Sequence, residues 1–360
     1  MQLPAAARRA HSDAMSSYRA VMLTGAGGPE VLVETELPVV EPGAGEVRVA
    51  VRATGAGATD LMMRAGKYRF APKLPFVPGY EVVGDVAALG AGVTGLAVGD
   101  RVAALTVHGG YAEQLVRPAR DFVRVPAGLD DGEVVALILN YVTAYQAIHR
   151  VARLAPGQTA LVTGASGGVG SALLELLRLH GVRAIAAASP ARHAYVRGLG
   201  AEPIDGRAGD LAAAVRQVVG GGVDAAFDGL GGRHTATCIR ATRRGGVVVG
   251  YGFVGATTAA GAPSGLAALR GMAALFVRAP LSGRRGRFYG ITLRYRKDPQ
   301  PFHDDLQALM GLLGAGAIHP RIARRLPLLA AREAQALLER GGVEGKLVHL
   351  RALGSGASRA

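Results

Sequence analysis

Short segments of alternating hydrophobic and polar residues fill the first third of the chain. Examples are residues 46–51, 80–86 and 101–105, and Pro-Gly, Gly-Asp and Gly-Gly pairs separate such segments. Alternation with a period of two between turn residues is typical of β-strands. The region from Tyr18 to about Pro126 therefore predicts an irregular β domain.

A second pattern begins near residue 159, where short apolar runs alternate with stretches of helical spacing. The runs that predict strands are 160–163, 184–187, 223–227 and 246–250. Strands that alternate with helices predict an α/β fold with a parallel, doubly wound sheet. The last part, residues 291–350, is mixed, and helical spacing recurs at 302–313 and 331–340.

Residues 159–171 read Thr-Ala-Leu-Val-Thr-Gly-Ala-Ser-Gly-Gly-Val-Gly-Ser and lead into an apolar helical stretch. Gly164, Gly167 and Gly170 leave no Cβ where a pyrophosphate would approach the backbone, and the helix directs free N–H groups at that anion. A second strand over 183–188 follows where a βαβ crossover requires it. The pattern predicts a dinucleotide site; the alternative is a strand-to-helix turn that only tolerates glycine.

The end of this second strand bears on the choice of cofactor. NAD sites usually place an acidic residue about 20 positions past the glycine turn, whereas NADP sites supply cations for the 2′-phosphate. Residues 188–193 read Ala-Ser-Pro-Ala-Arg-His, without a carboxylate. Ser189 and Arg192 are therefore expected to hold the phosphate, which favours NADPH over NADH. Alternatively, Arg192 is a solvated residue of the next helix.

Composition is that of a two-domain enzyme. The chain has 360 residues, of which 49% are hydrophobic, enough for two cores. Its one cysteine, Cys238, excludes an intrachain disulfide framework and favours a reducing, cytoplasmic setting. The net charge is +14, but aromatic residues make up only 5% and Trp is absent. Because no row of stacking residues accompanies the charge, no nucleic-acid partner is predicted.

No apolar run reaches the roughly 18 residues of a membrane span. The run at 266–277 comes nearest, but Arg270 interrupts it, so it predicts a buried, interface or substrate-covering helix. The basic cluster at 284–297 predicts a surface connection. Residues 1–17 are basic and small and lack an apolar signal sequence, which indicates a flexible extension or a misplaced start, with Met15 as an internal candidate.

Seven different short motifs follow one another along nearly the whole chain, from about residue 18 to 350. They lie at residues 78–84 (Pro-Gly-Tyr-Glu-Val-Val-Gly), 98–102 (Val-Gly-Asp-Arg-Val), 109–113 (Gly-Gly-Tyr-Ala-Glu), 140–145 (Asn-Tyr-Val-Thr-Ala-Tyr), 164–170, 227–232 (Phe-Asp-Gly-Leu-Gly-Gly) and 345–348 (Gly-Lys-Leu-Val). This series resembles the zinc-free quinone oxidoreductase branch of the medium-chain dehydrogenase/reductase superfamily. The apolar helix near Leu266 and residues 288–292 are similar to its vesicle-protein-like members.

The resemblance implies a GroES-like catalytic domain made from both ends of the chain, residues 18–139 and 290–352. A Rossmann NADPH-binding domain, 140–289, would be inserted between them, with a tail at 353–360. A homodimer is the family expectation. The cofactor residues that the resemblance implies are Thr143, Gly164, Gly167, Gly168, Val169, Gly170, Ser189, Arg192, Gly250, Tyr251 and Lys346.

Zinc-dependent relatives need an early thiolate and a Gly-His-Glu segment, because tetrahedral zinc takes sulfur and nitrogen ligands. Here the segment reads Gly79-Tyr80-Glu81, and the early cysteine position falls near Thr59. The four-cysteine structural lobe is also missing. The sequence therefore predicts no metal.

Without a Lewis acid, an isolated carbonyl accepts hydride poorly. A quinone or an α,β-unsaturated carbonyl spreads the charge onto an oxygen that a hydrogen-bond donor stabilises. We therefore expect hydride transfer from NADPH to such a small-molecule substrate. Tyr68 matches a family tyrosine at the mouth of the site and is the expected donor; alternatively it is only a packed aromatic residue.

Two departures weaken the catalytic part of the resemblance. An Asn and a Tyr that family quinone reductases often carry are Gly57 and Met62 here. Asp60 and Arg64 stand at helical spacing and predict a structural ion pair rather than a catalytic role. An NADPH-binding module that acts through a partner without turnover therefore remains an alternative function, and a nucleic-acid-associated protein is a third.

Overall fold

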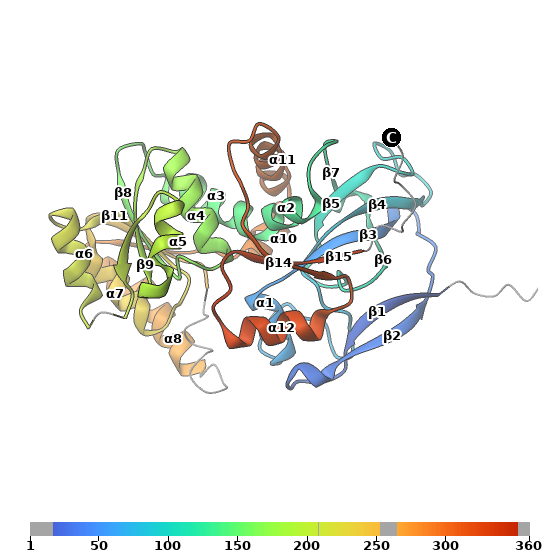
Figure 1. Cartoon of the computed structure of the whole chain (residues 1–360), viewed down its shortest axis with the longest axis horizontal. Coiled ribbons are helices and arrows are strands. Elements are labelled where there is room, and N and C mark those ends of the chain that lie inside the picture. The colour runs from blue at the N-terminus through green and yellow to red at the C-terminus, as the bar shows by residue number, and fades with distance from the viewer. Residues whose placement is uncertain (1–16, 208, 253–264, 352–360) are drawn as a thin grey trace, which may run out of the picture.

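The computed structural model describes residues 17–207, 209–252 and 265–351. These residues form two β-sheet regions, on the left and right of Figure 1, with helices between them. We call residues 159–288 the Rossmann half, and residues 17–130 with 322–350 the mixed-sheet half. The predictions for residues 1–16, 208, 253–264 and 352–360 lie outside the described residues.

Six parallel strands build the Rossmann half, in the order β10-β9-β8-β11-β12-β13. This order is that of a dinucleotide-binding sheet, and the predicted doubly wound α/β fold is confirmed. The strands are β8 (Thr159–Thr163), β9 (Arg183–Ala188), β10 (Glu202–Asp205), β11 (Val223–Asp228), β12 (Thr242–Gly250) and β13 (Arg285–Phe288). The helices are α4 (Gly168–Leu179), α5 (His193–Gly198), α6 (Leu211–Val219), α7 (Arg233–Ala241), α8 (Gly265–Ala273) and α9 (Ala279–Leu281).

Both ends of the described chain meet in the mixed-sheet half. Its seven-stranded sheet has the order β14-β15-β3-β4-β5-β7, and β6 pairs with β3. Strand β15 lies between β14 and β3, which joins residues about 300 positions apart. Strands β1 (Ser17–Leu23) and β2 (Leu32–Pro38) form a separate two-stranded sheet. The strands of the larger sheet are β3 (Glu46–Ala56), β4 (Glu81–Leu89), β5 (Arg101–Leu105), β6 (Gln114–Pro118), β7 (Val123–Arg124), β14 (Ile322–Pro327) and β15 (Lys346–Leu350). Helices α1 (Ala58–Arg64) and α12 (Ala331–Arg340) belong to the same half.

Strand β3 shows how the alternating pattern becomes a core. Val47, Val49 and Val51 are fully buried, while the residues between them are partly exposed. Since successive side chains of a strand point to opposite faces, the three valines line one face of the sheet.

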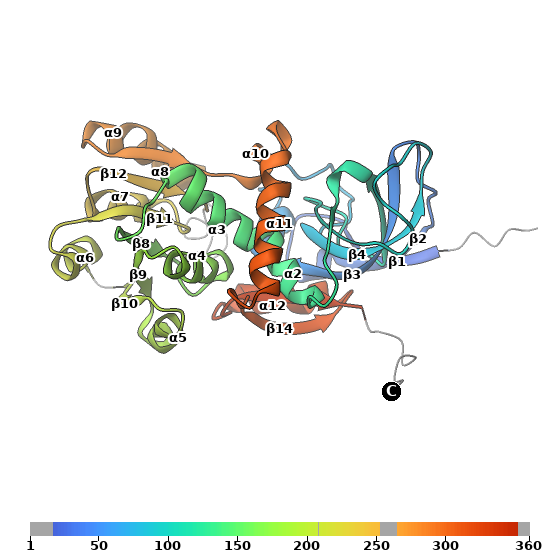
Figure 2. The same cartoon turned by 90° about the horizontal axis from the view of Figure 1, so that it is seen from above.

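Four helices lie between the two sheets, as Figure 2 shows from above. They are α2 (Asp131–Ala136), α3 (Val142–Gln146), α10 (Ile291–Lys297) and α11 (Gln300–Gly314). π-Helical turns at Leu137–Tyr141 and Ala147–Ala152 join α2 and α3 into one helical stretch. The domain boundary predicted at residue 140 falls inside this stretch.

The apolar run predicted at 266–277 is helical, as α8 followed by a π-helical turn at Ala274–Arg278. Leu275 is buried against the Rossmann core, but other apolar side chains of this segment are exposed by half or more. They are Leu269, Phe276 and Val277, and Leu281 of the following helix α9 is exposed as well. A buried helix is therefore the wrong description for these residues, because only one face of the segment packs on the sheet.

Candidate functional site

The three glycines of the turn after β8 serve different purposes. Gly164 has φ +66°, which favours glycine. A Cβ on Gly170 would clash with the carbonyl oxygen of Gly164, so glycine is needed there for packing. Gly167 has an ordinary φ of −77°, and a Cβ on it would meet only the Gly164 oxygen, at 3.4 Å. Neither the backbone conformation nor protein packing therefore requires a glycine at position 167.

Helix α4 starts directly after this turn, at the carboxyl end of β8. Strand β8 lies between β9 and β11, which is where the strand order reverses and where such sheets bind ligands. The N–H groups of the first turn, which includes Gly168, Val169 and Gly170, have no acceptor within a helix. This end of α4 suits a pyrophosphate.

Thr143 lies in α3, which packs against α4. Its side chain is buried, yet its Oγ1 has no hydrogen-bond partner within the described chain. A buried hydroxyl without a partner is costly, so a ligand group that bonds to it would be favourable. Thr143 therefore fits the role of a cofactor contact.

Gly250 and Tyr251 lie at the carboxyl end of β12. The Tyr251 N–H donates to Asp228 O at the end of β11 (3.0 Å), and the Tyr289 N–H donates to Gly250 O (2.8 Å). The ends of β8, β11, β12 and β13 thus form one continuous edge, which we call the carboxyl edge. The structure brings the glycine turn, Gly250 and Tyr251 together along it.

Arg192 follows β9 and reaches across to the mixed-sheet half. Its Nη1 lies 2.5 Å from Oε1 of Glu344, and its Nη2 donates to Gly342 O at 2.7 Å. Ser189, three residues earlier, makes no side-chain hydrogen bond within the described chain. The Arg192 guanidinium is thus not a freely solvated group, but is held by Glu344.

Lys346 and Glu81 form a buried ion pair in the mixed-sheet half, with 3% and 0% side-chain exposure. The Lys346 ammonium is thus paired with Glu81, a carboxylate that was not predicted as a site residue. A Cβ on Gly57 would stand 3.7 Å from Lys346 Nζ, so the site of the missing family Asn borders this pair. The adjacent Gly345 N–H donates to Ser166 O of the glycine turn (3.3 Å), which brings this segment to the carboxyl edge.

Tyr68 shares hydrogen bonds with two hydroxyl groups from distant segments. Its hydroxyl lies 2.6 Å from that of Tyr80 and 2.9 Å from Oγ1 of Thr292. The hydroxyls of Tyr80 and Thr292 are also in contact. Thr292, in α10, follows only three residues after Tyr289, which is bonded to Gly250 O. Three residues of chain therefore connect the carboxyl edge to Thr292, and so to the hydroxyl cluster of Tyr68, Tyr80 and Thr292.

Asp60 is buried, and its Oδ2 accepts a hydrogen bond from the Gly57 N–H (2.9 Å). Its Oδ1 has no partner in the described residues. Burial, and secondarily the charge of Glu81, raise the pKa of Asp60 to about 7, although Lys346 opposes the shift.

The predicted ion pair between Asp60 and Arg64 is wrong. Arg64 instead donates to Gly27 O and to Gln335, and it pairs with Glu339 of α12. One turn of helix separates Asp60 from Arg64, but Asp60 bonds to the N-cap of its own helix, whereas Arg64 finds its partners on neighbouring elements.

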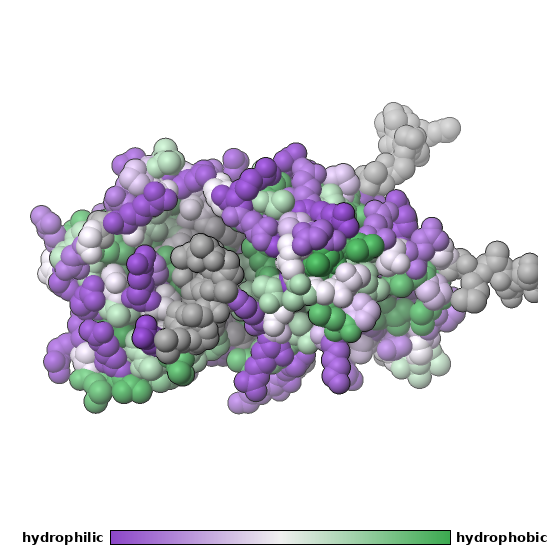
Figure 3. Space-filling model, turned by 90° about the horizontal axis from the view of Figure 1, so that it is seen from below, coloured by the Kyte–Doolittle hydropathy of each residue, from purple (hydrophilic) through white to green (hydrophobic). Residues whose placement is uncertain are grey.

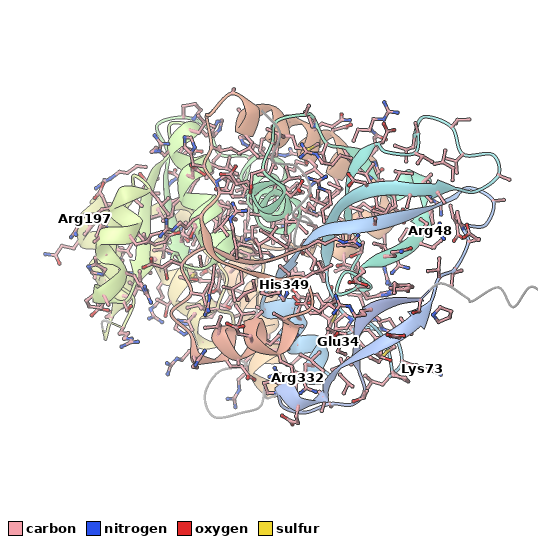
Figure 4. The ribbon with its side chains drawn as sticks, turned by 45° about the vertical axis from the view of Figure 1, so that its right-hand side comes forward. Glu34, Arg48, Lys73, Arg197, Arg332 and His349 are labelled. Carbon is pink, nitrogen blue, oxygen red and sulfur yellow. The ribbon has the colours of Figure 1, made fainter. Side chains whose placement is uncertain are left out.

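Figure 4 places His349 inside the mixed-sheet half, whereas Lys73 lies at the outside of that half and Arg197 at the outside of the Rossmann half. The His349 ring lies 5.2 Å from the ring of the buried Tyr111. Burial lowers the pKa of His349 to about 4, so this side chain is neutral at ordinary pH. The interior of this half thus holds polar groups as well as the valine core.

Within residues 17–207, 209–252 and 265–351, no three His, Cys, Asp or Glu side chains come together as a metal site. No described helix is long and apolar enough to cross a membrane. Figure 3 shows hydrophilic side chains distributed over the face seen from below, with smaller hydrophobic patches between them. Cys238 is buried in the Rossmann half.

Glu81 and Thr292 were not predicted as site residues. Glu81 belongs to the Gly-Tyr-Glu segment that argues against zinc, so the sequence drew attention to its position. Its pairing with Lys346 could not be predicted from that segment. Thr292 belongs to residues 288–292, whose only sequence signal was similarity to one subgroup. Its contact with Tyr68 joins residues 224 positions apart.

Two family models match the chain. Residues 43–127 match the alcohol dehydrogenase GroES-like domain, and residues 199–348 match the model described as zinc-binding dehydrogenase. The first match lies in the mixed-sheet half, which confirms the predicted GroES-like domain. The second covers the Rossmann half after β9 and continues into β15.

Curated relatives include the rat synaptic vesicle membrane protein VAT-1 homolog, 36% identical over 67% of this chain. That alignment covers 60% of the rat protein, so the chain matches less than two thirds of this relative's length. The zebrafish VAT-1 homolog is 31% identical over 95% of this chain and 72% of its own length.

Solved structures of similar fold include a Pseudomonas syringae quinone oxidoreductase, with a TM-score of 0.81, 28% identity, and coverage of 92% of this chain and 99% of that one. A mycobacterial protein in complex with NADPH has a TM-score of 0.80, 28% identity and the same coverage. A nicotinamide dinucleotide site at the carboxyl edge agrees with this likeness. The chain belongs to the medium-chain dehydrogenase/reductase superfamily of oxidoreductases, in its zinc-free branch of quinone oxidoreductase-like and VAT-1-like proteins.

Proposed function

We propose that the protein is an NADPH-dependent reductase that transfers hydride to a quinone or an α,β-unsaturated carbonyl without zinc. One observation carries this proposal. At position 80, where zinc-dependent relatives carry a metal ligand, a tyrosine hydroxyl is bonded to the hydroxyls of Tyr68 and Thr292. Hydrogen-bond donors thus occupy the part of the site where a Lewis acid would act.

NADPH as the cofactor is supported by several features of the Rossmann half. Gly167 is open to a ligand, Thr143 has an unpaired hydroxyl, and no acidic residue follows β9. The mycobacterial protein whose structure is in complex with NADPH has a similar fold. Ser189 and Arg192 would hold the 2′-phosphate, and Arg192 would then exchange or share its contact with Glu344.

When bound, the reduced nicotinamide supplies the hydride for the reaction. Tyr68 would donate a hydrogen bond to the carbonyl oxygen of the substrate, where negative charge develops. The Arg296 guanidinium lies 4.8 Å from the centre of the Phe70 ring, and its charge lowers the pKa of Tyr68, although burial raises it overall. A cation near Tyr68 also favours charge on the substrate oxygen.

A conjugated acceptor fits this site better than an isolated ketone. A phenol stabilises a developing anion less than a metal ion does, so the substrate itself must spread the charge. Met62 and Gly57 provide no polar group for a quinone oxygen, which favours a bulkier or more apolar acceptor.

The test is NADPH oxidation against a panel of quinones and enones, with NADPH binding measured separately by fluorescence. We expect turnover with at least one acceptor, and the rate should survive exhaustive chelation because the proposed chemistry uses no metal. Tight NADPH binding without oxidation by any acceptor would contradict the proposal.

A second candidate is an NADPH-binding module that acts through a partner. Gly57 and Met62 favour it, because they replace residues that hold substrate in related quinone reductases. The same panel discriminates between the two functions.

A cytoplasmic homodimer is the proposed form of the protein. Exposed apolar side chains of the π-helical turn after α8 and of α9 lie near β13, the edge strand of the parallel sheet, and would be covered by a second copy. Leu281, which is 84% exposed, offers a test. Leu281→Arg should shift sedimentation from dimer to monomer, whereas an unchanged dimer would exclude this surface from the interface.

A further inference from the structure

The hydroxyl cluster contains three side chains, of which two are buried and one, Tyr68, is partly exposed. Tyr80 and Thr292 are each 2% exposed, whereas Tyr68 is partly exposed. The Tyr68 ring is held edge-on between Phe70, at 5.7 Å, and Tyr80, at 5.9 Å between ring centres. Two buried hydroxyls thus contact the hydroxyl of one partly exposed tyrosine whose ring is packed on both sides.

The number of protons limits how this cluster can be arranged. Each hydroxyl donates one proton, and the described hydrogen bonds give Tyr80 and Thr292 no acceptor outside the cluster. Both can donate directly to Tyr68, or one can donate to the other, which then donates to Tyr68. In these two arrangements Tyr68 accepts at least one hydrogen bond, and its own proton points away from the cluster. A cyclic arrangement, in which Tyr68 donates to one of the other hydroxyls, opens when a substrate oxygen accepts the Tyr68 proton instead.

The same contacts influence what remains after Tyr68 loses a proton. Burial raises the pKa of Tyr68, but hydrogen bonds from Thr292 and Tyr80 lower it. Burial raises the pKa of Tyr80 well above its ordinary value, so Tyr80 remains a donor while Tyr68 ionises. The two buried hydroxyls therefore stabilise a Tyr68 phenolate.

From this geometry we propose that Tyr80 and Thr292 are positioning residues that direct the Tyr68 proton toward the substrate and stabilise the phenolate left behind. This inference rests on the proposed function and names the groups that make Tyr68 its proton donor. The hydride brings its electron pair to the β-carbon of the acceptor. The Tyr68 O–H bond then breaks, its proton passes to the resulting enolate, and its electron pair stays on the Tyr68 oxygen. Solvent reprotonates Tyr68 through its exposed side.

The kinetic test compares Thr292→Val, which removes the hydroxyl at nearly constant shape, with Thr292→Ser, which keeps it. For an acceptor from the panel, Thr292→Val and Tyr80→Phe should lower kcat about two- to tenfold, with KM and NADPH affinity nearly unchanged. The basic limb of the kcat–pH profile should move to higher pH, and Thr292→Ser should restore both properties. In a Tyr68→Phe background, Thr292→Val should have no further effect.

A second measurement does not depend on turnover. In protein labelled with 3-fluorotyrosine, ¹⁹F NMR follows the ionisation of Tyr68, with its resonance assigned by Tyr68→Phe. Thr292→Val should raise the pKa of Tyr68, and Thr292→Ser should not. If no acceptor is reduced but this pKa shift appears, the proposed function fails while the donor arrangement stands. An unchanged pKa of Tyr68, or full additivity of Thr292→Val with Tyr68→Phe, would overturn the inference. Should Tyr80→Phe fail to fold, the Thr292 pair still decides the question.

Discussion

The glycine turn and the hydroxyl cluster are built in opposite ways. The turn occupies seven consecutive residues, 164–170, and presents backbone N–H groups, whereas the cluster joins side chains 12 and 224 positions apart. A backbone site depends on local conformation and on the absence of side chains. A side-chain site depends on packing between segments that are distant in sequence. Cofactor binding and proton donation should therefore be separable by mutation.

The largest expected effect is at Gly167. Gly167→Val places a branched side chain where the pyrophosphate approaches, and the loss of several charge-assisted hydrogen bonds should weaken NADPH binding by more than about a hundredfold. The fold should survive, because the backbone there is extended and a Cβ has room. Fluorescence titration with NADPH and a melting curve check both points.

Gly170→Val is the matched contrast, because a Cβ at Gly170 would clash with the Gly164 carbonyl oxygen. It should lower the melting temperature more than Gly167→Val does. If NADPH binds Gly167→Val as tightly as the native protein, position 167 does not face the cofactor.

The next largest effect is expected at Arg192. Arg192→Ala should weaken NADPH binding by about 1.5–3 kcal/mol, the range for hydrogen bonds to charged groups, and leave NADH binding nearly unchanged. Arg197→Ala, an exposed residue of α5, is the control. Glu344→Gln should leave NADPH binding equal or tighter, since it releases the Arg192 guanidinium. Equal losses for NADPH and NADH in Arg192→Ala would reject the phosphate assignment.

Much of the cofactor side was predictable from the sequence, because its signals are local. The strands at 160–163, 184–187 and 246–250 and the glycine turn were located correctly. The partner of Arg192 was not predictable, since Glu344 comes from the other half of the molecule. Loop 341–345 reaches the turn only through the pairing of β15 with β3.

The catalytic side was less predictable because its contacts join segments that are distant in the sequence. Tyr68 was selected by resemblance, but its contacts with Tyr80 and Thr292 required the placement of α10 beside the mixed-sheet half. The predicted pair of Asp60 and Arg64 failed because helical spacing permits a contact without requiring one. Burial and the positions of Gln335 and Glu339 decided the outcome instead.

A smaller effect is expected at Tyr68, on catalysis alone. Tyr68→Phe keeps the ring but removes the donor, and we expect kcat to fall about tenfold, roughly 1.4 kcal/mol in the barrier. A dry site would lose about a hundredfold, but Tyr68 is partly exposed and water can substitute. NADPH affinity should not change. A matching loss of NADPH affinity would remove the separation between the two sites.

The smallest effect concerns pH and stability. The ordinary pKa of an Asp is 3.8 and that of folded Asp60 is about 7, so the folded state holds an extra proton between these values. Asp60 therefore costs stability as the pH rises through this window, and the cost is complete above pH 7. Asp60→Asn should raise the melting temperature more at pH 8 than at pH 5, relative to the native protein. The exposed Asp304→Asn is the control, and a difference independent of pH would contradict the assignment.

The most direct test of the account follows the transferred hydride itself. NADPH carrying deuterium at C4 of the nicotinamide, on the transferred face, is incubated with the protein and an enone, and the product is examined by mass spectrometry and NMR. We predict one deuterium at the β-carbon of the product and a proton from solvent at the α-carbon. A protein that binds this NADPH yet transfers deuterium to no enone, and oxidises NADPH with no quinone, would contradict the central claim.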